Sequence, residues 1–197
     1  MTNVHICQRC LDVIEDDILP MTRSGVGAGN KVFGAAILRK SDLSLVVAGT
    51  NGEIENPLHH GEISTLNAYY ALPAHDRPAT ADCVFVSTHE PCSLCLSAIT
   101  WAGFDNFYYF FGYEDTRDAF NIPHDLKILQ EVFKVADGNY ARENAFWACH
   151  DLIALSAGID DDGRIAREAQ ISRIRAAYDE LSRTYQSSKT ENDIPLS

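Results

Sequence analysis

Strand-like and helix-like segments alternate through the middle of the chain, and this alternation limits the possible folds more than any other feature. Two β-prone runs, residues 32–38 and 43–48, are separated by a short polar turn, which predicts a hairpin. Such regular alternation predicts a layered α/β fold. The segments that follow the hairpin are a helix at 61–72, a strand at 83–88, a helix at 92–102, an aromatic strand at 107–111 and a helix at 125–133.

Both ends of the chain are predicted to be helical. Apolar residues near the helical period predict an opening helix over residues 3–19, which Pro20 and the glycines after it are expected to end. Two further helices are predicted at 140–156 and 164–185. The polar residues 186–197 are expected to fray.

Composition restricts the class of protein. With 197 residues, 46% of them hydrophobic and 22% charged, the chain is expected to form one soluble domain with a substantial core. No run approaches the roughly 18 apolar residues of a membrane helix, and the first residues do not resemble a signal peptide, so we expect a cytoplasmic protein. Such a protein keeps its thiols reduced, so the six cysteines are expected to bind metal or to be buried, not to form disulfides.

The charge balance bears on the partner. The formal net charge of -12 repels phosphate backbones and favours small or uncharged substrates over nucleic acid. The alternative explanation is that the acidity provides only solubility.

Two short motifs carry the chemistry: His-x-Glu at His60 and Glu62, and Pro-Cys-x-x-Cys at Cys92 and Cys95. Cysteines three residues apart at a helix start converge on one metal, and the helix dipole favours their thiolates. His60, at the start of the preceding helix, is the expected third ligand. Three protein ligands leave the open position of a catalytic zinc, whose bound water has a pKa near about 7. Glu62 points elsewhere on a regular helix, so we expect it beside that water as general acid and base.

A closed, structural zinc site is the alternative. Its fourth ligand would be a residue such as His59, His89 or Cys83, and the protein would then be a non-catalytic interaction protein that uses zinc to fold. That alternative leaves Glu62 and the polar loop at Asn51 without a purpose.

His-x-Glu followed by Pro-Cys-x-x-Cys is the signature of zinc deaminases. Over residues 32–118 the chain resembles the cytidine deaminase-like superfamily. Residues 60–66 are similar to fungal cytosine deaminase, whereas Phe33-Gly34-Ala35 and Trp101-Ala102 are similar to bacterial guanine deaminase.

The resemblance implies an architecture and an assembly. It implies a three-layer α/β/α sandwich around a mixed five-stranded sheet with extra C-terminal helices, one zinc ion per subunit and a homodimer. Residues 1–158 would form the zinc-dependent deaminase domain. Residues 159–197 would form a helical extension packed on that domain or on a neighbouring subunit.

The resemblance also implies residues that contact substrate. They are Asn51, which would hydrogen-bond the base; Phe33, on the pocket wall; Gly61, through its backbone N–H; Glu90, in the loop beside the exocyclic group; and Asp115, near an aspartate that assists guanine binding or proton transfer. Two departures stand out, since guanine enzymes usually have alanine at the position of Gly61 and nothing obvious matches His89.

The leading expectation is hydrolytic deamination of a free nucleobase or a related aminated heterocycle, guanine-like or cytosine-like, with release of ammonia. A tRNA adenosine deaminase or a nucleoside or nucleotide deaminase is the alternative enzyme. The tRNA enzyme would need a positive surface, which the mixed charges of the C-terminal segment do not supply.

Overall fold

One mixed sheet forms the centre of the computed structural model, which describes residues 2–196. The strand order is β2-β1-β3-β4-β5. Strand β1 is antiparallel to β2 and β3, whereas β4 is parallel to β3 and β5. The strands are β1 (Gly34–Arg39), β2 (Leu45–Thr50), β3 (Cys83–His89), β4 (Asn106–Phe111) and β5 (Ala148–Asp151).

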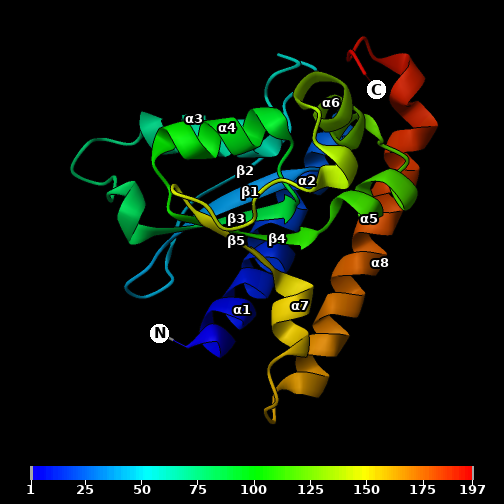
Figure 1. Ribbon diagram of the computed structural model, residues 1–197. Coiled ribbons are helices and arrows are strands. Elements are labelled where there is room, and N and C mark those ends of the chain that lie inside the picture. Colours follow the sequence, from blue (N-terminus) through cyan, green and yellow to red (C-terminus); the bar gives the residue numbers. More distant parts are fainter. Residues whose placement is uncertain (1, 197) are drawn as a thin grey trace.

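Helices cover both faces of the sheet, so the predicted three-layer α/β/α architecture is confirmed (Figure 1). On one face lie α3 (Gly61–Ala71) and α4 (Ser93–Ala102). On the other lie α1 (Asn3–Asp12), the π-helical turn η1 (Val13–Ile18), α2 (Leu19–Gly27), α7 (Leu152–Ala157) and α8 (Arg164–Ser188). Helices α5 (Tyr113–Asp118) and α6 (His124–Phe133) follow β4, and short 3-10 turns form at η2 (Thr80–Asp82), η3 (Ala136–Gly138) and η4 (Lys189–Glu191).

Side-chain alternation along the strands divides the core into two clusters. In β1, Ala36 and Leu38 face α1 and α8, while Ala35 and Ile37 face α3 and α4. Successive residues of a strand point to opposite faces, and here both faces are covered. The fully buried pattern of β3 and β4 follows from that double cover.

The prediction that Pro20 ends the first helix is wrong. Helix α1 continues through η1 directly into α2, and Pro20 lies in the first turn of α2. In the π-helical turn the N–H of Leu19 bonds to the carbonyl of Ile14, five residues back, which restarts the hydrogen-bond pattern. A proline in the first turn of a new helix costs little, because its missing N–H would have no intrahelical partner there.

The predicted helix at 140–156 is wrong for residues 140–151, and only its last residues are helical, in α7. Residues Ala148–Asp151 form β5, which adds to the sheet parallel to β4, with Asn106 opposite Ala148. Asp151 then caps α7 by accepting hydrogen bonds from two backbone N–H groups. Pairing with a distant strand overrides local helical periodicity, and the sequence alone does not show that the edge of β4 is free. The short helix α5 was not predicted either.

The C-terminal residues contact the rest of the chain, and the expectation that they fray stays a prediction. Helix α8 runs to Ser188, and Asn192 then donates its side-chain amide to the carbonyl of Gly29 at 3.0 Å. Ile194 is 6% exposed. Helix α8 packs on the sheet of its own chain, although the division into units at residue 158 stays a prediction.

Within residues 2–196, no helix combines the length and the apolar character needed to cross a membrane. The cytoplasmic location stays a prediction from sequence.

Candidate metal centre

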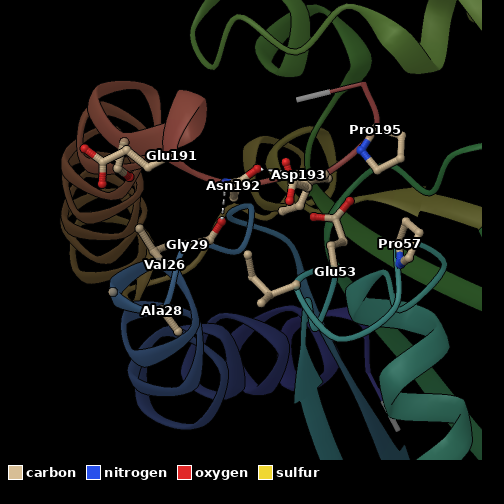
Figure 2. A pocket seen from close by; sticks show the side chains of 13 residues that line it. Val26, Ala28, Gly29, Glu53, Pro57, Glu191, Asn192, Asp193 and Pro195 are labelled. Atoms are coloured by element: carbon tan, nitrogen blue, oxygen red, sulfur yellow. Dashed lines mark hydrogen bonds between the residues drawn. The ribbon is translucent and has the colours of Figure 1, made fainter.

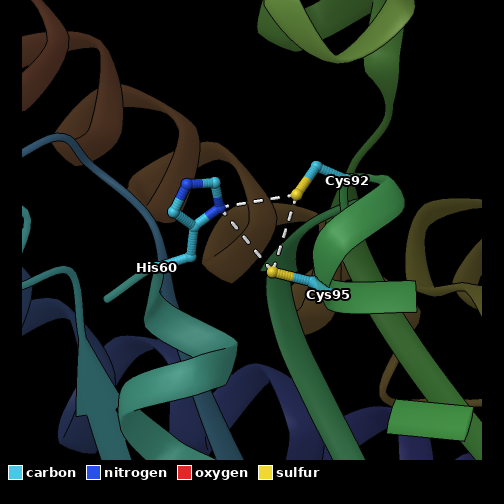
Figure 3. Close-up of side chains that lie close together, drawn as sticks. All are labelled: His60, Cys92 and Cys95. Atoms are coloured by element: carbon cyan, nitrogen blue, oxygen red, sulfur yellow. Dashed lines mark hydrogen bonds between the residues drawn. The ribbon is translucent and has the colours of Figure 1, made fainter. Parts of the chain in front are cut away.

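Three side chains converge at the N-termini of α3 and α4 (Figure 3). The His60 Nδ1 atom lies 3.4 Å from the Cys92 sulfur and 3.7 Å from the Cys95 sulfur, and the two sulfurs are 3.7 Å apart. Tetrahedral zinc, with bonds of about 2.3 Å to sulfur and about 2.0 Å to nitrogen, requires sulfurs about 3.8 Å apart and sulfur–nitrogen distances of about 3.5 Å. The triangle therefore has the dimensions of a zinc site.

The backbone places these ligands through two helix starts. His60 and Cys92 are the N-cap residues of α3 and α4, and Cys95 lies in the first turn of α4. Gly61 brings α3 against β1, since a Cβ atom on it would lie 2.6 Å from the Cα atom of Gly34. The lack of a side chain at Gly61 therefore decides how closely His60 approaches the sheet.

The pKa values of the three candidate ligands are shifted by their close contact, and the Cys92 thiolate favours binding of a cation. The hydrogen bond between the Cys92 and Cys95 sulfurs, together with His60, holds the pKa of Cys92 well below its usual value in spite of burial. Burial and the neighbouring Cys92 raise the pKa of Cys95 well above its usual value. Burial alone would lower the pKa of His60, but the Cys92 thiolate and two nearby carboxylates raise it to about 9. Metal binding would replace the protons on Cys95 and His60.

Glu62 lies beside the triangle without being part of it, as the sequence predicts for an acid/base residue. Its Oε1 accepts a hydrogen bond from the Ser87 hydroxyl at 2.9 Å, and its Oε2 lies 3.2 Å from the Cys95 sulfur. Burial, and next the charge of Cys92, raise the pKa of this carboxyl. Glu62 can therefore hold a proton at a pH where an exposed glutamate would have lost it.

The fourth position of the site is open. Across residues 2–196, no fourth histidine, cysteine or acidic side chain joins the triangle. His89 instead packs between Phe33 and Phe111, with ring centroids 4.7 Å from each. Open coordination distinguishes catalytic zinc from structural zinc.

A cavity of about 200 Å³ lies against the metal site. The sequence-predicted residues Phe33, His60, Glu62, Glu90 and Cys92 line it, and so does His89. Further lining residues carry no motif in the sequence: Lys31, Glu53, Leu58, Ser93, Leu94, Ile122, His124, Asp125, Ile128, Pro195 and Leu196.

Of two further predicted substrate residues, Glu90 lines this cavity, whereas Asn51 does not line it and contacts it only through Glu53. Asn51 is buried, donates its amide to Glu53 at 2.8 Å, and has a side-chain oxygen without a hydrogen-bond partner. Glu90 forms an ion pair with Arg142 and accepts hydrogen bonds from the Tyr140 hydroxyl and a backbone N–H. These bonds hold the loop that leads to Cys92.

Asp115 does not line the cavity. It accepts a hydrogen bond from the Gly112 N–H at the start of α5 and pairs with Arg175 at 3.2 Å. Asp125, at the start of α6, lines the cavity instead, and burial followed by the charge of Cys92 raises its pKa to about 8. In the sequence, the only indication that Asp125 belongs to the site is the polar His124-Asp125 pair after Pro123. The substrate role of Asp115 stays a prediction.

A wider pocket of about 640 Å³ adjoins the cavity (Figure 2). Glu53 and Pro195 line both, and the segment from Asn192 to Pro195 lies along the wider pocket. The hydrogen bond from Asn192 to Gly29 holds this segment in place. The C-terminal residues therefore form part of the wall around the metal site, a role their polar sequence did not predict.

Comparison with known proteins agrees with this geometry. Residues 18–111 match the family model described as the cytidine and deoxycytidylate deaminase zinc-binding region. Together with the five-stranded sheet and the ligand triangle, this match shows that the chain is similar to the cytidine deaminase-like superfamily. None of the curated proteins matches it significantly.

Similar solved structures include two guanine deaminases. The enzyme from Nitrosomonas europaea is 20% identical, with 82% of this chain and 80% of that chain covered and a TM-score of 0.50. The enzyme from Bacillus subtilis is 22% identical, with 86% and 92% covered and a TM-score of 0.50. A mutant protein in complex with 8-azaguanine is 20% identical, with 86% and 80% covered and a TM-score of 0.52. At this identity the likeness shows a shared fold.

Proposed function

We propose that the protein is a zinc-dependent hydrolytic deaminase of a free nucleobase or a related aminated heterocycle, from which it releases ammonia. The observation that carries the proposal is a three-ligand triangle of zinc dimensions with a buried Glu62 beside it, at the wall of a small cavity. His60, Cys92 and Cys95 would hold one zinc ion per subunit.

The residues of the chain account for the proton transfers. His60, Cys92 and Cys95 would hold a zinc ion, which would act as a Lewis acid and lower the pKa of water toward about 7. Glu62 accepts the proton of the attacking water, delivers it to a ring nitrogen of the substrate and assists protonation of the departing ammonia. Ser87 orients Glu62 for these transfers through its hydrogen bond to Oε1. Phe33 supplies an apolar wall against which a flat ring can pack.

The cavity favours a small, uncharged substrate. Its volume of about 200 Å³ is below the roughly 300–1,000 Å³ of pockets for drug-sized ligands. Among the described residues that line it, Lys31 is the single lysine or arginine, and Glu53 neutralises it. A tRNA substrate would need a positive surface around the cavity, and the net charge of -12 opposes that.

Guanine-like substrates are the first candidates, followed by cytosine-like ones. Two of the similar structures are guanine deaminases and a third is a complex with 8-azaguanine, which supports the purine class. Asp125 lines the cavity and is placed to take the substrate role that the family resemblance assigned to Asp115. A carboxyl at this position can accept a hydrogen bond from an N–H of the base.

We also propose that the protein is a homodimer. Leu94 and Trp101 lie seven residues apart on the outer face of α4, and Trp101 is 91% exposed. An exposed tryptophan beside other apolar residues is typical of an interface. Trp101→Ser is expected to shift the protein from dimer to monomer in sedimentation velocity, and a monomeric wild-type protein would contradict the assembly.

Ammonia release from a panel of free bases, nucleosides and triazines tests the activity. The zinc-loaded protein is expected to deaminate guanine or cytosine, while Glu62→Ala keeps its zinc and loses turnover by about 10²–10⁴-fold. Equal rates in the wild type and the variant would refute the acid/base role. No turnover of any compound, together with salt-dependent retention of tRNA, would favour the RNA alternative.

A further inference from the structure

The carboxylate of Glu53 is buried at the wall of the cavity beside the metal site and contacts three partners. Its Oε1 lies 3.0 Å from the Lys31 ammonium and 3.8 Å from Nε2 of His60. Its Oε2 accepts a hydrogen bond from the Asn51 amide at 2.8 Å. The side chain is 1% exposed. One buried carboxylate therefore contacts the proposed metal ligand His60 and the predicted substrate residue Asn51.

Lys31 is the ion-pair partner of this carboxylate. The side chain of Lys31 is itself only 7% exposed, and a buried charge is tolerated only where an opposite charge compensates it. The pair is neutral as a whole, so it adds no net charge to the cavity. Lys31 and Glu53 come from segments on either side of the β1–β2 hairpin, and their contact ties those segments together.

The hydrogen bond to Glu53 also determines how Asn51 is oriented. A carboxylate only accepts hydrogen bonds, so the amide nitrogen of Asn51 must face Glu53 and its oxygen must face away. That oxygen is buried and has no hydrogen-bond partner among the described residues. Asn51 is therefore held as an acceptor for an N–H group.

His60 presents its two ring nitrogens to different partners. Nδ1 faces the two sulfurs, and Nε2 lies on the side of Glu53. A histidine that binds metal through one nitrogen carries its proton on the other, and a carboxylate on that side orients the ring and strengthens it as a ligand. Glu53 is in the position of such a carboxylate.

We propose that Glu53, paired with Lys31, is a positioning residue that orients His60 toward the metal and Asn51 toward the substrate. The inference rests on the proposed role of His60 as a zinc ligand. It also specifies the substrate, because a fixed acceptor at Asn51 selects a heterocycle that presents an N–H at that point.

Zinc affinity tests the inference independently of turnover. Glu53→Gln keeps the shape of the side chain and removes its charge, and it is expected to weaken zinc binding by about 10–100-fold in competition with a chromogenic chelator. Glu55→Gln is the matched control, because Glu55 is exposed on the same loop. The control is expected to bind zinc as the wild type does.

Two further variants keep the test decisive if Glu53→Gln folds poorly. Glu53→Asp retains the charge at a slightly greater distance, and an intermediate loss of zinc affinity is expected. Lys31→Met should weaken zinc binding alone but have no added effect in a Glu53→Gln background, since Lys31 acts through Glu53. Additive effects of the two substitutions would contradict that coupling.

Substrate analogues test the orientation of Asn51. Wild-type protein should discriminate against a base methylated at the recognised ring nitrogen, and Glu53→Gln should reduce this discrimination, because a glutamine no longer fixes the direction of the Asn51 amide. Wild-type zinc affinity in Glu53→Gln with unchanged discrimination would overturn the inference and leave the proposed function intact. A wild-type protein that binds no zinc would instead refute the proposed function.

Discussion

Glu62 offers a prediction in which activity and stability move in opposite directions. The side chain is 4% exposed, and burial together with the Cys92 charge raises its pKa. The folded state therefore holds a proton on Glu62 to a higher pH than the unfolded state does. Between the unfolded value near about 4.5 and the raised folded value, the unfolded state loses its proton first, so stability falls as the pH rises.

Glu62→Gln removes this penalty while keeping the hydrogen bond to Ser87. A stabilising substitution of this kind is commonly worth about 1 kcal/mol, which in a chain of this length raises the Tm by about 2–4 °C. The same change removes the proton carrier and should lower kcat by about 10²–10⁴-fold.

Thermal unfolding of metal-free protein from pH 4 to pH 8 would check the effect on stability. Zinc content and ammonia release, measured in parallel on zinc-loaded protein, would check the effect on activity. The gain in Tm should appear as the pH rises above about 4.5, and Glu55→Gln should show no such gain. A Tm for Glu62→Gln at or below that of the wild type at pH 8 would refute the argument that burial of this carboxylate is costly. Loss of zinc would refute the separation of Glu62 from the ligands.

Three other perturbations test the site. Zinc binding at pH 7 should release about two protons, one from His60 with its raised pKa and one from Cys95. Calorimetry in buffers of different ionisation enthalpy would count these protons. Release of none would contradict the charge states of the metal-free site. Gly61→Ala should cost about 1–3 kcal/mol in urea unfolding, because its Cβ would meet Gly34, and an unchanged midpoint would show that α3 shifts freely. Deletion of residues 192–197 should raise KM, because the tail lines both pockets, and an unchanged KM would remove the tail from the substrate site.

Much of the fold could be predicted from local pattern. The hairpin of β1 and β2, helices α3 and α4 and strand β3 follow from periodicity and turn residues, and the motif placed His60 and Cys92 at the starts of the two helices. These features depend on neighbours in the chain, so the sequence determined them by itself.

The errors share one physical cause, which is the dominance of distant contacts over local preference. Pairing with β4 made a strand of Ala148–Asp151 where periodicity predicted helix. The π-helical turn before Pro20 and the anchoring of Asn192 on Gly29 likewise depend on tertiary packing.

The same distinction between local spacing and distant contacts separates the motif residues from the rest of the site. The sequence by itself determined the four side chains of the deaminase motif, because their spacing within two helix starts is local. Only the tertiary structure brought Lys31 to Glu53, placed Asp125 in the cavity and left Asp115 outside it. Those contacts join segments far apart in the chain, and only packing of the whole fold decides which side chains meet.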